Sequence, residues 1–336
     1  MLTSTLRTII LATALLSLAL PAHAQRFLSV KNGRLVQDGQ TVTLRGATMY
    51  PYWLDGGKLY RSEGWTMPGF PRYIDQLLDL AQSAGLNTIR PTDDLLGAKD
   101  AYDPVVWKNL DYLVAAAAKR HMYVILDLST YRNFEQAAKK PGYDIAAWTR
   151  FLDFLVPRYK NAANVVGYSI AGEVEAPNGS SPNRLDAAGY IDFFTSTENT
   201  IHALDPNHLI YAGGLSQLDW NSGVPWRRIF SLPDNAVCAI HVYSPGDRDK
   251  TLPMVAAWAK AHGKPFLIEE FGFPQKLGDA QRAQDYQNLY TLADQAGACG
   301  AVFWNLGREF APQSYDVGPQ TPLTWAAVRR NADAAR

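Results

Sequence analysis

The chain of 336 residues is poor in cysteine, with two, and has no excess of either charge, with 32 Lys and Arg against 32 Asp and Glu. The chain is too long for a small disulfide-stapled module, and its even charge argues against a general nucleic-acid binder, which would carry an excess of basic residues. The apolar run from Thr8 to Leu20 has 13 residues and is shorter than the roughly 18–20 that span a membrane. We therefore expect no nucleic-acid partner and no membrane partner.

Several short motifs are also absent. No Cys/His cluster has metal-ligand spacing, and the chain has neither a glycine-rich phosphate loop nor a Gly-x-Ser-x-Gly elbow. We expect no metal and no cofactor. The two cysteines, Cys238 and Cys299, fall in different apolar segments, and we expect them to be free, buried thiols.

The first 24 residues predict a signal peptide. Arg7 supplies the basic start, Thr8 to Leu20 the apolar centre, and Ala22-His23-Ala24 the small-x-small cleavage site. An uncleaved anchor helix is the alternative, and the short apolar run disfavours it. We expect cleavage near Ala24, a mature chain over residues 25–336, and a secreted or periplasmic location.

Apolar, β-branched segments recur eight times in the rest of the chain, and every gap between them can hold a helix. The segments centre on Gly46, Thr88, Ile125, Tyr168, Ile210, Ile240, Ile268 and Val302. Helical spacing of apolar residues predicts helices over 71–84, 104–117, 145–155, 184–204, 251–262, 279–297 and 322–333, and Pro225 and Pro233 predict a short one in the fifth gap. This alternation predicts an α/β fold with a parallel sheet covered on both faces, a single (β/α)8 TIM barrel over residues 25–336.

A short β-hairpin is predicted before the barrel. Phe27–Val36 and Thr41–Leu44 flank Asp38-Gly39, which is a strong two-residue turn signal. The hairpin could close the bottom of the barrel. An open doubly wound sheet is the alternative fold, and the missing phosphate-binding glycine motif disfavours it.

Function in such a barrel is expected at the C-terminal ends of the strands. Each apolar segment ends on a charged, polar or aromatic residue, and the notable ones are Arg90, Asp127, Glu173, His241, Tyr243, Glu270 and Trp304. Two carboxylates on the fourth and seventh strands, with an arginine, a His-x-Tyr pair and a tryptophan, make a recognisable set.

The segments around these residues resemble family 5 of the glycoside hydrolases, the cellulase and β-mannanase family of clan A. The likeness covers nearly all of residues 25–336. It rests on Thr48-Met49-Tyr50, Asn87-Thr88-Ile89-Arg90, Asp205-Pro206-Asn207-His208-Leu209-Ile210, and Lys264-Pro265-Phe266-Leu267-Ile268-Glu269-Glu270-Phe271-Gly272.

The resemblance implies a retaining glycosidase with Glu173 as the acid/base and Glu270 as the nucleophile. In that mechanism the two carboxyl groups stand about 5–5.5 Å apart. Substrate-binding roles are implied or expected for Arg90, His241, Tyr243, Trp304, Gly172, Tyr50 and Trp53. Gly172 stands where the family has an Asn that contacts the 2-hydroxyl of the reacting sugar.

Each residue also has a plain structural interpretation. A glutamate at a strand end can be half of an ion pair, His241 can be a hydrogen-bonded core residue, and Trp304 can be core. Neighbours in a strand face opposite sides, so we expect only one of Glu269 and Glu270 to point into the site, and the resemblance selects Glu270.

We therefore expect a secreted, monomeric endo-β-glycosidase that hydrolyses a β-1,4-linked polysaccharide, with mannan as the first choice of substrate. A cellulase or other β-glucan hydrolase of the same family is the alternative. Because Gly172 removes a sugar contact, a catalytically weakened barrel that binds polysaccharide or oligosaccharide is a second alternative.

Overall fold

The computed structural model describes residues 27–49, 53–55, 58–60, 69–91, 102–128, 145–174, 177–178, 184–215, 222–307 and 314–334. The predicted signal peptide, residues 1–24, lies outside them. Among the residues described, no helix is both long and apolar enough to cross a membrane.

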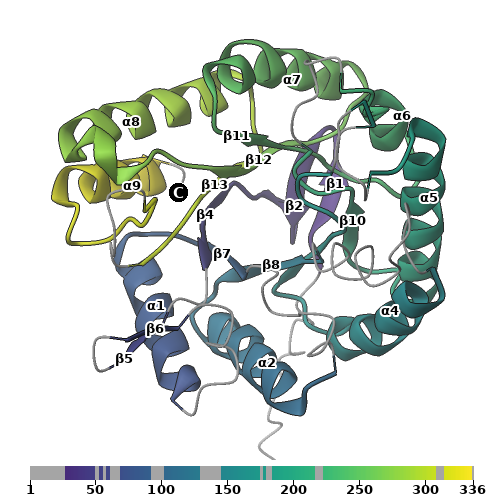
Figure 1. Cartoon of the computed structure of the whole chain (residues 1–336), viewed down its shortest axis with the longest axis horizontal. Coiled ribbons are helices and arrows are strands. Elements are labelled where there is room, and N and C mark those ends of the chain that lie inside the picture. The colour runs from purple at the N-terminus through teal and green to yellow at the C-terminus, as the bar shows by residue number, and fades with distance from the viewer. Residues whose placement is uncertain are drawn as a thin grey trace, which may run out of the picture.

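Eight parallel strands form a nearly closed barrel, as the sequence predicts (Figure 1). They are β4 (Leu44–Met49), β7 (Thr88–Pro91), β8 (Tyr123–Asp127), β9 (Val165–Ser169), β10 (Leu209–Tyr211), β11 (Cys238–Val242), β12 (Phe266–Phe271) and β13 (Gly300–Phe303). The strands follow one another around the ring in this order, and β13 pairs with β4. Between β10 and β11, two isolated bridges, Ile210 with Asn235 and Leu215 with Ile240, replace a continuous ladder.

A helix follows every barrel strand, and Figure 1 shows these helices as an outer ring. They are α1 (Phe70–Ser83), α2 (Pro104–Lys119), α4 (Ile145–Tyr159), α5 (Ala187–Leu204), α6 (Trp226–Phe230), α7 (Leu252–Ala261), α8 (Asp279–Gln295) and α9 (Pro322–Ala334). The fifth helix, α6, has five residues, in agreement with the prediction of a short one. Local capping explains two of the helix starts, because the Asp103 and Asp186 side chains accept hydrogen bonds from Val105 N and Gly189 N.

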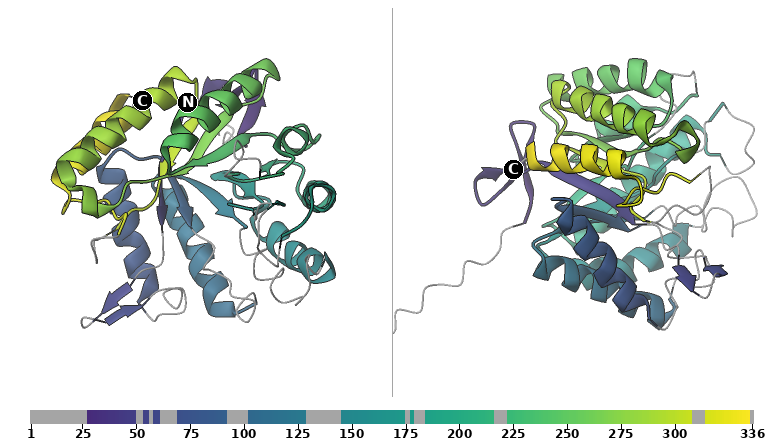
Figure 2. Two further views of the ribbon diagram at one scale, coloured as in Figure 1. Left: turned by 45° about the horizontal axis from the view of Figure 1, so that its top comes forward. Right: turned by 90° about the vertical axis from the view of Figure 1, so that its left-hand side faces the viewer.

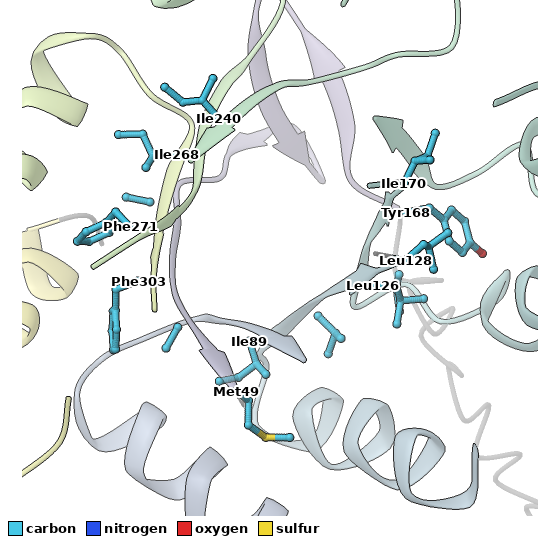
Figure 3. Close-up of a cluster of buried hydrophobic side chains, with 14 of the residues drawn as sticks. Met49, Ile89, Leu126, Leu128, Tyr168, Ile170, Ile240, Ile268, Phe271 and Phe303 are labelled. Carbon is cyan, nitrogen blue, oxygen red and sulfur yellow. The ribbon is translucent and has the colours of Figure 1, made fainter. Parts of the chain in front are cut away.

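The strands bury both faces, in two separate clusters. One residue in two points outward and packs against the helices, and Figure 3 shows Ile89, Leu126 and Ile268 among these. The alternate residues, Leu267 and Val302 among them, form a second cluster inside the barrel. This alternation is the reason that the strands read as continuous apolar runs.

Three short antiparallel strands precede the barrel: β1 (Ser29–Lys31), β2 (Arg34–Gln37) and β3 (Gln40–Thr41). The prediction of one strand over 27–36 is wrong, because a second turn at Asn32-Gly33 divides it, with φ of 53° and 71°. Two-residue turns with both φ positive match strand twist, so Asn-Gly acts here as Asp-Gly does after β2. Leu28 and Leu35 join the inner cluster, so this sheet closes one end of the barrel as expected (Figure 2).

A second, two-stranded sheet consists of β5 (Trp53–Asp55) and β6 (Lys58–Tyr60). Two further turns of helix are η3 (Asp247–Thr251), of π type, and η4 (Gln275–Leu277), of 3-10 type. Cys238 and Cys299 are free and buried, as predicted.

Candidate active site

Polar side chains converge where the strands end, at the edge of the barrel that the sequence selected. Arg90 lies on β7 and Asp127 on β8, whereas Glu173 follows β9. From the other half of the ring come His241 and Tyr243 of β11 and its end, and Glu269 and Glu270 of β12. The structure therefore brings five predicted residues together: Glu173, Glu270, Arg90, His241 and Tyr243.

Glu270 accepts a hydrogen bond at each carboxylate oxygen. Arg90 Nη1 donates to Oε2 at 2.6 Å, and the Tyr243 hydroxyl donates to Oε1 at 2.6 Å. The Glu270 side chain is 10% exposed, so it is nearly enclosed but open on one side. Two strong donors fix the plane of this carboxylate, which suits a group that must attack along one direction.

Arg90 is the central cation of the cluster. Its Nη2 lies 2.6 Å from Asp127 Oδ2, and its Nε lies 3.9 Å from Glu269 Oε1. Burial on its own lowers the pKa of Arg90, but the charges of Asp127, Glu269 and Glu270 raise it well above the ordinary value. The guanidinium is therefore permanently charged, and its fork holds two carboxylates at fixed positions.

Glu173 is the more open carboxyl group, with 42% of its side chain exposed. Its Oε1 lies 3.1 Å from His241 Nδ1, and its backbone N–H donates to the Gly214 carbonyl at 3.3 Å. Gly172 is buried directly before it and has no side chain that could contact a sugar. An exposed carboxyl oriented by one ring is suited to exchanging a proton with a bound molecule.

His241 is enclosed by carboxylates and backbone. Its Nδ1 also lies 3.8 Å from Glu270 Oε1, and its Nε2 lies 3.8 Å from Glu269 Oε2. Burial lowers the pKa of His241, but Glu270, Glu173 and Glu269 together raise it to about 10. A Cβ at Gly214 would collide with the imidazole ring, so only glycine leaves room for it there.

An irregularity in β12 places two neighbouring glutamates on one side of the strand. His241 pairs with Glu270 although Ile240 pairs with Ile268, so one residue of β12 is extra. The expectation that only one glutamate reaches the site is wrong, because both lie within ion-pair distance of Arg90. A β-bulge cancels the alternation of side chains, and bulges are common at barrel rims beside active sites.

Glu173 and Glu270 approach each other closely. One carboxylate oxygen of each, together with one ring nitrogen of His241, all lie within 4.8 Å of one another. Within the described part of the chain, this is the group of donors that could hold a metal ion. Its atoms are already engaged with Arg90, Tyr243 and one another, so a cation would have to displace these hydrogen bonds.

Aromatic residues stand next to this cluster. Trp304 directly follows β13 and is half-buried. Tyr315 packs edge-to-face on Tyr243, with ring centroids 5.8 Å apart. Tyr50 lies outside the described residues, and nothing is described of the Trp53 side chain. The β5–β6 sheet that carries Trp53 lies beside α1, outside the ring of strands (Figures 1 and 2).

Sequence reasoning did not assign four residues that support the site. The sequence marks Asp127 as a polar strand end without a role, and in the structure it forms an ion pair with Arg90. The other three residues give weaker signals in the sequence. Tyr211 ends an apolar strand, Gly214 belongs to the Gly-Gly pair that follows it, and Tyr315 stands in a loop between distant elements. Only the position of Asp127 at a strand end could have indicated its role beforehand.

A pair of glutamates held at the C-terminal mouth of a (β/α)8 barrel is the arrangement of the barrel glycosidases. Sequence comparison identifies the family within this class: the model described as "Cellulase (glycosyl hydrolase family 5)" matches residues 37–309. The chain belongs to this family and is a glycoside hydrolase that acts on polysaccharide.

Individual relatives fall into two groups by substrate. The mannan endo-1,4-β-mannosidase A of Podospora anserina is 23% identical over 330 residues, which cover 84% of this chain and 83% of the relative. The major extracellular endoglucanase of Xanthomonas campestris pv. campestris is 25% identical over 373 residues, covering 97% and 73%. The endo-1,4-β-mannanase structure from Rhizomucor miehei superposes with a TM-score of 0.74 at 17% identity, over 92% of this chain and 99% of that one. These likenesses establish a mannanase- or cellulase-like hydrolase.

Proposed function

We propose that this chain is a secreted, retaining endo-β-1,4-mannanase in which Glu173 is the acid/base and Glu270 is the nucleophile. The proposal rests chiefly on the short approach of the two carboxylates, with one oxygen of each within 4.8 Å. Retaining glycosidases hold their carboxyl groups about 5–5.5 Å apart, whereas inverting enzymes leave about 6.5–9.5 Å for a water molecule. The approach therefore supports direct attack by a carboxylate.

The surroundings divide the two roles. Glu270 has both oxygens held by Arg90 and Tyr243 and is 10% exposed, which suits a fixed nucleophile. Glu173 is 42% exposed, and its Oε1 lies 3.1 Å from His241 Nδ1. The exposed group has access to a leaving oxygen and to water, which an acid/base must reach in turn.

Two displacements follow from this division. In the first, Glu270 attacks the anomeric carbon, and the C–O bond to the leaving sugar breaks as Glu173 gives its proton to that oxygen. In the second, Glu173 removes a proton from water, whose oxygen attacks the same carbon and releases the Glu270 carboxylate. Two inversions at one carbon retain the β configuration.

Mannan is the proposed substrate because two of the three relatives described above are named for it. The Xanthomonas endoglucanase covers a larger share of this chain, so a β-1,4-glucan is the second candidate. Secretion is proposed from the predicted signal peptide and from the word "extracellular" in that relative's name.

The test is an assay of the purified protein on soluble β-1,4-mannan, glucomannan and carboxymethylcellulose, with the anomeric configuration of the first product read by proton NMR. We expect fastest turnover of mannan, oligosaccharide products of several lengths, and a β-anomer that appears first. An initial α-anomer would refute the retaining mechanism, and binding without turnover on every glycan would favour the binding barrel. Faster turnover of carboxymethylcellulose than of mannan would make β-1,4-glucan the preferred substrate in place of mannan.

The roles of the two glutamates are tested with Glu173→Ala, Glu270→Ala and the control Glu198→Gln. Glu198 is buried like Glu270, at 2% exposure, but lies on helix α5. We expect azide to restore turnover of an activated aryl glycoside in both alanine variants. It should give a β-glycosyl azide with Glu173→Ala, because the ester on Glu270 still forms, and an α-glycosyl azide with Glu270→Ala. If Glu173→Ala gave the α-glycosyl azide and Glu270→Ala the β-glycosyl azide, Glu173 would be the nucleophile and Glu270 the acid/base.

A further inference from the structure

A third carboxylate, Glu269, lies inside the barrel beside Tyr211, Arg90 and His241, and double displacement gives it no task. Its side chain is fully buried. Oε1 accepts a hydrogen bond from the Tyr211 hydroxyl at 3.0 Å and lies 3.9 Å from Arg90 Nε. Oε2 lies 3.8 Å from His241 Nε2. Burying a carboxylate is costly, so its presence needs a reason beyond packing.

Glu269 contacts the two residues that hold the catalytic pair. Arg90 reaches Glu269 through Nε and Glu270 through Nη1, at 3.9 and 2.6 Å. His241 reaches Glu269 through Nε2 and Glu173 through Nδ1, at 3.8 and 3.1 Å. The buried Glu269 carboxylate is therefore linked to both catalytic glutamates through one residue each: to Glu270 through Arg90 and to Glu173 through His241.

The two nitrogens of His241 make the consequence specific. A neutral imidazole carries one proton, and if that proton is on Nε2, the Nδ1 atom presents a lone pair to Glu173. With an oxygen of Glu173 on one side and the Glu269 carboxylate on the other, an imidazolium can direct an N–H to each of them. The charged groups that face this ring are Glu173, Glu269 and Glu270, and they raise the pKa of His241 against the effect of burial.

The charge of Glu269 is itself secured by its neighbours. Burial raises the pKa of Glu269, but Arg90 and His241 lower it to about 2, and Ser169 adds to this effect. Because its pKa is lowered to about 2, Glu269 is an anion near neutral pH. It acts as a fixed charge and not as a proton donor.

We propose that Glu269 is a positioning residue, which keeps His241 doubly protonated so that an N–H always points at Glu173, and which steadies Arg90 beneath Glu270. The inference rests on the proposed function for the identity of the two catalytic glutamates. Its direct target is the state of His241, which can be measured without any substrate.

The experiment compares Glu269→Gln and Glu269→Asp with the wild type and with Glu198→Gln as the remote buried control. Ring nitrogens of His241 are followed by NMR of histidine-labelled protein between pH 5 and 10, with His241→Gln to assign the signals. We expect the wild type and Glu269→Asp to stay doubly protonated at pH 8. In Glu269→Gln we expect His241 to lose a proton at a pH at least about one unit lower than in the wild type. The Glu198→Gln variant should match the wild type.

Turnover provides the second readout. We expect kcat of Glu269→Gln to fall roughly 10- to 100-fold with KM changed less than about threefold, since the lost contact orients groups and does not bind sugar. Glu269→Asp keeps the charge and should lose less. A packing role predicts the opposite order, because Gln has the shape of Glu and Asp does not.

An unchanged His241 titration in Glu269→Gln, or a worse kcat in Glu269→Asp than in Glu269→Gln, would overturn the proposal. If Glu269→Gln does not fold, a neutral His241 at pH 8 in the folded Glu269→Asp variant would overturn it equally. A wild type that hydrolyses no glycan would refute the proposed function alone, because the NMR result still decides what Glu269 does.

Discussion

Deleting the Tyr243 hydroxyl tests whether turnover depends on how Glu270 is held. Tyr243→Phe keeps the ring and its edge-to-face contact with Tyr315 but removes the 2.6 Å hydrogen bond to Glu270 Oε1. A hydrogen bond to a charged group contributes about 1.5–3 kcal/mol, which corresponds to a loss of roughly 10- to 150-fold in kcat/KM. Arg90 still holds Oε2, so the variant should keep some activity.

A second tyrosine gives a matched control. The hydroxyl of Tyr168 donates to Asp205 Oδ2 at 2.8 Å, and both residues are buried on the helix side of the barrel. Tyr168→Phe therefore removes the same kind of bond away from the site. We expect it to lower the melting temperature and to keep kcat/KM within about twofold of the wild type.

The assay measures kcat/KM of both variants on the glycan that the wild type hydrolyses fastest, with thermal unfolding alongside. Equal kcat/KM for Tyr243→Phe and the wild type would refute the reasoning, and equal losses in both variants would assign the effect to stability.

Three further predictions concern other groups. Gly214→Ala should reduce kcat at least about 100-fold, because a Cβ there collides with the His241 ring, while circular dichroism stays unchanged. The pKa of Glu269 is lowered from 4.5 to about 2, so its contribution to stability is present above pH 4.5 and is lost as pH falls toward 2. The pKa of His241 is raised from 6.5 to about 10, so its contribution is present below pH 6.5 and is lost as pH rises toward 10. Calorimetry from pH 2 to 10 should show these two groups stabilising most between about pH 4.5 and 6.5, and a melting temperature that still rises above that window would contradict this. Burial raises the pKa of the Cys238 and Cys299 thiols to about 12, so a disulfide reagent at pH 8 should titrate no thiol in the folded protein and two after denaturation.

The barrel could be predicted from the sequence because its strands are buried on both faces. Such strands appear as apolar runs, and the intervening helices have their own period, so all eight units were found. The segment 27–36 holds two strands where one is expected, because Asn32-Gly33 forms a turn as Asp38-Gly39 does. Both pairs are turn signals of the same kind.

The site was predictable to the extent that it lies at strand ends. Arg90, Glu173, His241, Tyr243 and Glu270 each end an apolar strand, and they meet in space. Contacts between distant loops leave no such pattern, so Tyr315 beside Tyr243 could not be found. The bulge in β12 was also hidden, because a strand with one extra residue has the same composition as a regular one.

Because β12 contains one extra residue, the direction in which its side chains point depends on the number of residues in this strand. Leu267 packs inside the barrel and Phe271 packs against the helices, and the two glutamates between them share one side only because the strand gains a residue there. Deleting Ile268 would restore strict alternation and turn Glu269 toward the helices. An insertion or deletion of one residue within β12 therefore changes which side chains face the site.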